Sequence, residues 1–130
     1  MLIRNIEDCP GFLAGDKTRL REYLHPDKQP VAVRYSLAHA TLKPGGMSLK
    51  HRLSVSVVYF NIEGEGLMFI EDESRRVTAG DVVYLPPHCV QCIRNMWEGD
   101  LMFLCIVDPA WKQEYERVEE AEAPHAPTGA

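Results

Sequence analysis

Two histidines of this 130-residue sequence, His39 and His51, are candidate metal ligands. Each lies in a segment, 31–42 or 51–57, where large apolar residues recur at odd positions and polar residues such as Arg34 and Arg52 stand between them. Because successive side chains of a strand point to opposite faces, this pattern predicts that both imidazoles face a buried interior. Imidazole is a common ligand of transition metals. The alternative for His39 is a core histidine hydrogen-bonded to a neighbour or a buried water.

Three further polar residues, Tyr35, Tyr59 and Asn61, are predicted to face the same interior. For the last two the pattern is ambiguous, because their neighbours in sequence are also apolar, so that either both faces are covered or a bulge changes the alternation. A buried phenol or amide needs a hydrogen-bond partner, and in a barrel wide enough for one small ligand that partner can be the ligand. With His39, these are the candidate substrate-binding residues, and internal hydrogen bonding is the alternative for each.

Cys89 and Cys92 form a C-x-x-C motif, which can serve redox or zinc chemistry. Here the motif lies on a predicted strand, where residues three apart point to opposite faces, and no second ligand pair accompanies it in the sequence. We therefore predict that these two residues and Cys105 are small buried apolar side chains. With Cys9 there are four cysteines, too few for a disulfide scaffold, so we expect free thiols or ligands.

The elements that must position these residues are short strands. Runs rich in Val, Ile, Leu, Tyr and Phe alternate with Pro-, Gly- and acid-rich breaks from about Thr18 to Asp108, which is typical of an all-β sandwich or barrel. The predicted strands are 18–25, 31–42, 54–62, 66–71, 74–78, 82–85, 89–95 and 101–107.

After these strands, the sequence pattern changes from that of strands to that of a helix followed by a tail. Asp108 and Pro109 predict the start of an amphipathic helix, which places Trp111, Tyr115 and Val118 on one face. We expect residues 1–118 to form one domain with this helix, and residues 119–130, which are acidic and proline-containing, to form a disordered tail.

In two stretches of the chain, glycine, proline, histidine and amide residues recur at defined spacings. One is Gly45-x5-His51-x-Leu53-x3-Val57-x6-Gly64, and the other is Gly80-x5-Pro86-x-His88-x2-Gln91-x3-Asn95. In spacing they resemble the two motifs of the cupin superfamily without a gap, and the similarity covers about residues 31–109. The resemblance implies an all-β cupin double-stranded β-helix, a jelly-roll barrel, with the short C-terminal helix added.

In metal-binding cupins, two histidines and a glutamate of the first motif and a histidine of the second hold one divalent ion. The corresponding residues here are His51, Leu53, Val57 and Gln91. Leucine and valine offer no lone pair, so the resemblance implies a degenerate or weak site. His39 would complete a three-ligand set with His51 and Gln91 for a divalent transition metal (Fe, Mn, Ni, Cu or Zn). His88 stands where the motif has glycine, and we expect it at the surface or rim.

Two functions from different classes therefore remain open. The first is the binding of a small polar organic molecule in the barrel interior, which the apolar Leu53 and Val57 favour. The second is a metal-dependent cupin enzyme of the oxygenase, isomerase or lyase type, with His51, Gln91 and a further ligand on the metal and Tyr59 or Asn61 orienting the substrate. Fold alone does not choose between them.

Composition and charge argue against two classes of binding partner, nucleic acids and membranes. The sequence has 14 basic and 19 acidic residues, a formal charge of −5, so we expect no nucleic-acid binding driven by a broad basic field. No apolar run approaches the ~18 residues of a membrane span, and the first residues lack the apolar stretch of a signal peptide, so we expect a cytoplasmic protein that does not bind membranes. The cupin resemblance further implies a homodimer in which residues 1–6 form an exchanged strand.

Overall fold

The computed structural model describes residues 1–119, and strands make up most of their regular structure. In chain order the strands are β1 (Gly11–Leu13), β2 (Arg19–Leu24), β3 (Ser36–Leu42), β4 (His51–Leu53), β5 (Ser56–Glu63), β6 (Gly66–Ile70), β7 (Glu73–Val77), β8 (Val82–Leu85), β9 (Gln91–Asn95), β10 (Leu101–Asp108) and β11 (Glu116–Val118). Two short 3-10 helices, η1 (Ile6–Asp8) and η2 (Gln113–Tyr115), lie near the two ends of this part of the chain.

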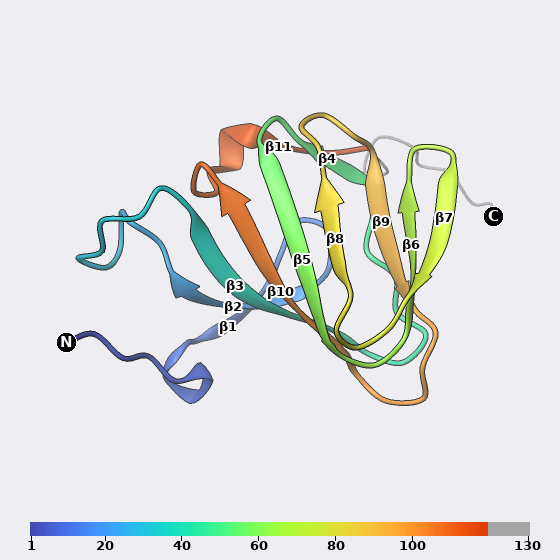
Figure 1. Ribbon diagram of the computed structural model, residues 1–130, viewed down its shortest axis with the longest axis horizontal. Coiled ribbons are helices and arrows are strands. Elements are labelled where there is room, and N and C mark those ends of the chain that lie inside the picture. The colour runs from blue at the N-terminus through green and yellow to red at the C-terminus, as the bar shows by residue number, and fades with distance from the viewer. Residues whose placement is uncertain (120–130) are drawn as a thin grey trace.

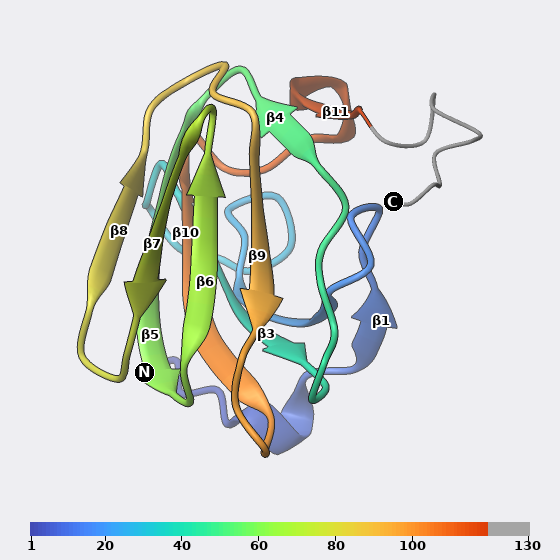
Figure 2. The same cartoon turned by 90° about the vertical axis from the view of Figure 1, so that its right-hand side faces the viewer.

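The strands form two antiparallel sheets that face each other (Figure 1). One sheet has the order β1-β2-β3-β10-β5-β8, and the other has the order β11-β4-β9-β6-β7. Figure 2 views the second sheet, with β10 and β3 of the first sheet behind it. Strands distant in sequence pair in both sheets, as β10 does with β3 and β11 with β4. This is the jelly-roll arrangement that the motifs implied, and the predicted fold class is confirmed.

The core lies between the two sheets and takes about every second side chain of the strands. Its apolar members include Leu42, Leu53, Val57, Met68, Val77, Leu85, Ile93, Leu101, Phe103 and Val107. The rings of Tyr59 and Phe103 pack with their centroids 4.6 Å apart. After β5 the chain turns at Gly64, whose φ is +94° and where a Cβ would lie 3.0 Å from the Trp97 ring. Glycine is therefore required for β10 to pack closely against this turn.

The face that β3 presents to the interior is opposite to the predicted one. Ser36, Ala38 and Ala40, at even positions, line the space between the sheets, so Leu37 and His39 point to the other side. On that outer side, Leu37 lies in a shallow pocket with Leu2, Arg4 and Leu104. The prediction was wrong because both faces of β3 carry apolar residues, so that alternation could not tell the inner face from the outer.

The predicted parity is correct in the segments that follow. His51, Leu53 and Val57 are buried and line the interior, as expected for residues 51–57. In β5 the odd positions continue inward, so that Tyr59 and Asn61 are buried while Phe60 and Ile62 are 38% and 40% exposed. The alternation therefore continues through Asn61 with an apolar outer face, and the register shift against β10 lies only at the end of the strand, between Asn61 and Glu63.

The predicted C-terminal helix is wrong. Ala110 N–H donates to the Arg34 carbonyl, and Trp111 N–H donates to Ser36 Oγ at 2.9 Å, which holds the chain in an extended form after β10. Only η2 is helical, and Glu116–Val118 then pair with β4. Sequence periodicity cannot predict this pairing, because β11 pairs with the edge of β4, and the two strands are more than sixty residues apart in sequence.

The C-terminal end of the described chain differs from expectation at one residue, whereas the exchanged N-terminal strand is untested. Glu119, predicted as the start of a disordered tail, donates its backbone N–H to the Lys50 carbonyl and pairs with Arg52 Nε at 2.9 Å. The rest of the predicted tail, residues 120–130, lies outside the described residues. Residues 1–5 form no strand in this chain, and the homodimer stays a prediction. Within residues 1–119 the structure contains no helix that is both long enough and apolar enough to cross a membrane.

All four cysteines, which lie within residues 1–119, are thiols rather than disulfides, as predicted. Cys9, Cys89 and Cys92 are buried, whereas Cys105 keeps some accessible surface because it lines the internal cavity described below. Burial raises the pKa of Cys105 from 9.0 to about 12, and nearby carboxylates of Asp16 and Glu116 act in the same direction.

We expect Cys105 to resist alkylation in the folded protein. Because its thiol pKa is about 12, only about a thousandth of it is thiolate at pH 9, where half of an ordinary cysteine is ionised. Iodoacetamide labelling at pH 8 to 9, followed by peptide mass spectrometry, should therefore modify Cys105 only after urea unfolding. Labelling of the folded protein at the rate of the unfolded chain would contradict a thiol that is un-ionised at this pH.

Candidate functional site

A cavity of about 340 Å³ lies between the two sheets. Its wall is mostly apolar and includes Leu20, Ala38, Ala40, Leu53, Val57, Phe103, Cys105 and Val107. These residues come from β2, β3, β4, β5 and β10, so strands form the apolar wall, while the β1–β2 turn and the segments around Lys28 and Trp111 complete the lining. Concave, mostly apolar spaces of this size with a few polar groups are the usual form of a small-molecule site.

Three polar side chains of the cavity lie together in one corner, made by Asp16, His51 and Glu116, which we call the acidic corner. Asp16 lies in the turn between β1 and β2, His51 begins β4, and Glu116 begins β11. One ligand atom from each side chain lies within 4.8 Å of the other two. Asp16 and His51 are buried, and Glu116 is half-buried. Three segments far apart in sequence therefore bring two carboxylates to one imidazole.

The orientation of His51 is defined by both ring nitrogens. Nδ1 lies 2.9 Å from the Leu49 carbonyl oxygen, which can only accept, so this nitrogen carries a proton and donates it. Nε2 faces the cavity side and lies 3.3 Å from Asp16 Oδ2. In the neutral tautomer, the lone pair of Nε2 is thus directed toward the carboxylate of Asp16.

The two carboxylates are each held through one oxygen. Asp16 Oδ1 accepts from the backbone N–H of Thr18 at 3.1 Å and from its hydroxyl at 2.7 Å. Glu116 Oε1 accepts from Trp111 Nε1–H at 3.0 Å. Burial raises the pKa of Glu116, while His51 and the Trp111 hydrogen bond work in the opposite direction and Asp16 adds to the rise.

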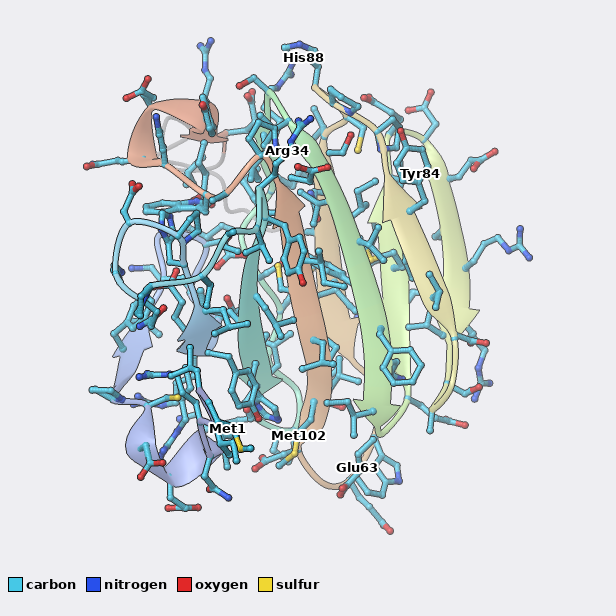
Figure 3. All side chains as sticks on the ribbon, turned by 60° about the vertical axis from the view of Figure 1, so that its left-hand side comes forward. Met1, Arg34, Glu63, Tyr84, His88 and Met102 are labelled. Carbon is cyan, nitrogen blue, oxygen red and sulfur yellow. The ribbon has the colours of Figure 1, made fainter. Side chains whose placement is uncertain are left out.

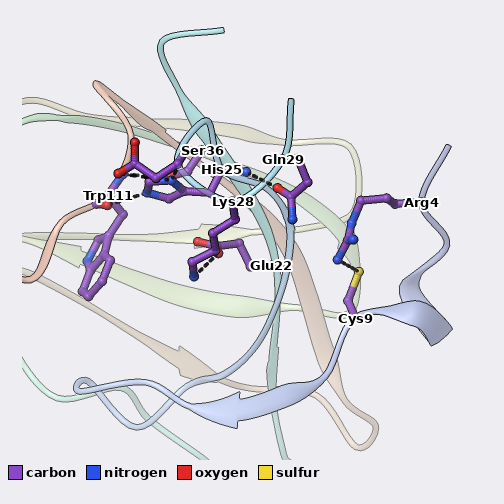
Figure 4. A network of polar contacts seen from close by, with 9 residues as sticks. Arg4, Cys9, Glu22, His25, Lys28, Gln29, Ser36 and Trp111 are labelled. Atoms are coloured by element: carbon purple, nitrogen blue, oxygen red, sulfur yellow. Dashed lines mark hydrogen bonds and ion pairs between the residues drawn. The ribbon is translucent and has the colours of Figure 1, made fainter. Parts of the chain in front are cut away.

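A network of polar contacts at the edge of the cavity holds Trp111 in place (Figure 4). The Trp111 backbone joins two segments, because its N–H donates to Ser36 Oγ and its carbonyl lies 2.8 Å from His25 Nε2. Beside it, Lys28 Nζ donates to Glu22 Oε1 at 2.6 Å. Both Lys28 and Glu22 line the cavity, so this network forms its polar rim and supports the tryptophan that positions Glu116.

Only part of the predicted residue set lies at the acidic corner. His51 is there, and Tyr59 lines the same cavity. Gln91 is paired with His51 across β9 and β4, but its side-chain oxygen accepts from the Tyr59 hydroxyl at 3.0 Å. Burial raises the Tyr59 pKa well above its usual value, so the phenol remains a hydrogen-bond donor to Gln91. Tyr59 and Gln91 are thus hydrogen-bonded to each other, which is the internal hydrogen bonding given above as the alternative for Tyr59.

The other predicted site residues lie away from the corner. His39 is on the outer side of β3, where burial and the Arg21 guanidinium lower its pKa. Tyr35 precedes β3 and is 37% exposed, and Asn61 Nδ2 donates to the Gly64 carbonyl at the other end of β5. His88 is exposed in the turn after β8, as expected, at the end of the sheets opposite Met102 and Glu63 (Figure 3). The structure therefore does not bring His39 together with His51 and Gln91.

Comparison with known proteins agrees with this architecture. The family model of the cupin domain matches residues 38–107, which contain both motifs. The chain belongs to the cupin family. An uncharacterised protein of Methanocaldococcus jannaschii is 33% identical to this cupin over 110 residues, covering 84% of this chain and 87% of that protein.

Solved structures show the same fold at lower identity. A cupin 2 conserved barrel protein from Salinispora arenicola matches with a TM-score of 0.73 and 20% identity, covering 88% of this chain and 92% of that one. The polyketide cyclase RemF from Streptomyces resistomycificus matches with 0.75 and 17%, covering 91% and 84%. Oxalate decarboxylase from Bacillus subtilis matches with 0.78 and 21%, covering 98% of this cupin and 35% of that chain.

The metal-ligand positions of the two cupin motifs do not fit a metal in this cupin. Leu53 and Val57 occupy two of them with aliphatic side chains that form part of the cavity wall. The amide oxygen of Gln91, at a third, already accepts from Tyr59. Only His51 of the four positions retains a nitrogen directed to the cavity, so the motif set by itself does not form a metal site.

Two residues of the acidic corner, Asp16 and Glu116, were missed from the sequence. Asp16 lies before the region that resembles the motifs, and its only local signal is the Asp-x-Thr turn in which its side chain binds the backbone of Thr18. Glu116 was assigned to a helix, and its true position in β11 depends on pairing with Leu53 of β4. Both positions result from contacts distant in sequence.

Proposed function

We propose that this cupin binds a small organic molecule in the barrel cavity, with an apolar body against the strand walls and a polar group at the acidic corner. The observation that supports this function is the cavity itself, about 340 Å³ of space with Asp16, His51 and Glu116 at one corner. Taking about 30 Å³ for each water-sized group, it has room for roughly ten non-hydrogen atoms. A ligand of that size would be largely enclosed.

The walls favour an apolar body on energetic grounds. Leu53, Val57 and Phe103 expose carbon atoms to the cavity, and burial of a matching surface stabilises a complex by about 25 cal/mol for each Å² removed from water. The acidic corner then determines orientation, because buried carboxylates and an imidazole require a hydrogen-bonding or coordinating group opposite them. An enzymatic function of this cupin would use the same corner, and the convergence of three ligand atoms there favours metal-dependent chemistry as the second candidate.

The probe that tests the cavity is 2-phenylethanol, which has an apolar ring and one hydroxyl group. We expect the metal-free protein to bind it saturably with a dissociation constant on the order of 1 mM, measured by NMR chemical-shift titration. Ala38→Phe places a ring into the cavity and should weaken binding at least tenfold. Thr41→Phe adds the same ring on the outer face of the same strand and should leave the affinity unchanged.

The melting temperature of each variant establishes that it is folded. Equal affinity in the wild type and in Ala38→Phe would overturn the cavity as the binding site, and so would the absence of saturable binding to the wild type. Shifts confined to residues on the outer face of β3 would have the same meaning.

A further inference from the structure

We propose that Asp16, His51 and Glu116 bind one divalent transition metal, at a site that shares only His51 with the cupin motifs. The proposal rests on the position and support of three ligand atoms, one from each side chain, within 4.8 Å of one another. The metal site itself does not depend on the organic ligand proposed above, although the two would share the acidic corner.

In each of the three side chains a neighbour holds one polar atom, which leaves the second atom to bind a metal. His51 Nδ1 donates to the Leu49 carbonyl, which leaves Nε2 available. Asp16 Oδ1 accepts from Thr18, which leaves Oδ2 beside Nε2. Glu116 Oε1 accepts from Trp111, which leaves Oε2. In metal sites, hydrogen bonds of this kind fix the orientation of the coordinating side chains.

The separation between Asp16 Oδ2 and His51 Nε2 also calls for a cation. With its Nδ1 proton given to Leu49, a neutral His51 presents a lone pair to a carboxylate oxygen 3.3 Å away. Two acceptors at this distance are stable only with a proton or a metal ion between them. Two ligands held about 2.1 Å from one tetrahedral ion lie roughly 3.4 Å apart, which matches the observed separation.

The donor set selects the class of metal. One imidazole nitrogen and two carboxylate oxygens suit Zn²⁺, Fe²⁺ or Mn²⁺, and the absence of sulfur in this trio disfavours soft ions such as Cu⁺. Two carboxylates balance the charge of a divalent ion in a corner where Asp16 and His51 are buried. Three protein ligands leave coordination positions open toward the cavity, as in catalytic rather than structural sites.

The metal would change what the cavity binds, and this second step rests on the proposed function. Without a metal, the two carboxylates of the acidic corner repel an anionic group. With a divalent ion on them, the corner attracts a carboxylate or enolate oxygen, which can fill an open coordination position. We therefore expect metal to convert the cavity into a site for small apolar molecules that carry an anionic group.

The experiment begins with full-length protein stripped by EDTA and titrated with Zn²⁺ in an isothermal calorimeter. We expect one equivalent to bind with a micromolar or lower dissociation constant. Asp16→Asn and Glu116→Gln preserve shape and hydrogen bonding but remove charged ligands, and each should weaken binding at least tenfold. The matched control Glu114→Gln, at an exposed position in η2, should change it less than threefold.

A second control separates this site from a motif-based one. Gln91→Met replaces the amide opposite His51 with a side chain of similar volume, and it should leave Zn²⁺ affinity within threefold because Gln91 is bound to Tyr59. The proposal is overturned if the wild type binds no stoichiometric Zn²⁺. It is equally overturned if Asp16→Asn and Glu116→Gln both bind as the wild type does, or if Gln91→Met alone abolishes binding.

Phenylacetate then tests the change in ligand preference. The Zn²⁺-loaded protein should bind it at least tenfold more tightly than the stripped protein does. Stoichiometric Zn²⁺ binding without any binding of phenylacetate or 2-phenylethanol would leave the metal site standing and refute the proposed ligand cavity. Binding of 2-phenylethanol by a protein that takes up no Zn²⁺ would refute the metal site and support the cavity.

Discussion

Saturating Zn²⁺ is expected to raise the melting temperature of the stripped protein by roughly 10 °C. A ligand present at 100 times its dissociation constant stabilises the folded state by about 2.7 kcal/mol, and in a domain of this size each kcal/mol shifts the midpoint by about 4 °C. The ion would join the β1–β2 turn, β4 and β11 through Asp16, His51 and Glu116. Since these ligands converge only in the folded chain, the stabilisation acts on the native state.

Differential scanning fluorimetry with and without EDTA measures this shift. At the same Zn²⁺ concentration the variant Glu116→Gln should show at most about half of this shift, because a site weakened tenfold stabilises the folded state by about 1.4 kcal/mol. A wild-type midpoint that is insensitive to both Zn²⁺ and EDTA would be incompatible with a metal that links these three segments.

Phe103→Ala is expected to lower the free energy of unfolding by about 3 to 5 kcal/mol, the usual cost of truncating a buried phenylalanine. Phe103 is 2% exposed and packs its ring against Tyr59, with the centroids 4.6 Å apart. It also forms part of the cavity wall, so its removal enlarges an existing space that the surrounding strands cannot close. Against a total stability of about 5 to 15 kcal/mol for a domain, this loss is large.

Urea denaturation followed by tryptophan fluorescence gives the comparison, with Phe60→Ala as the control. Phe60 lies on the adjacent strand β5 but on its outer face, where it is 38% exposed, so its truncation should cost less than about 1 kcal/mol. Similar losses for both variants would mean that the interior between the sheets is not the main core.

The two histidines illustrate how far strand alternation can be used. His51 lies in a segment whose even positions are polar, so a single sheet face could be buried and the prediction of an inward imidazole is confirmed. His39 lies on β3, where Ala38 and Ala40 on one face and Leu37 on the other are all apolar. Which face of β3 is interior depends on the second sheet, and the N-terminal segment covers the face that alternation had assigned to the core.

The positions of the two carboxylates of the acidic corner cannot be predicted from strand alternation. Asp16 and Glu116 are one hundred residues apart, and neither lies in the cupin motifs. They meet because β11 closes the edge of β4 and because the turn after β1 is tied to the segment before β4 by the hydrogen bond from Leu49 N–H to the Asp16 carbonyl. Both contacts are between backbone groups, which do not depend on residue type, so no side-chain pattern predicts them.

The amino-acid sequence by itself determined the all-β barrel, its motif spacing, the inward direction of His51 and the loss of the family's metal ligands at Leu53, Val57 and Gln91. These properties follow from local alternation, turn residues and residue type, all of which act over a few positions. The tertiary structure alone decided that β11 replaces a helix, that His39 lies outside, and that Asp16 and Glu116 join His51. Those outcomes depend on strand edges and sheet faces, which exist only once distant segments have paired.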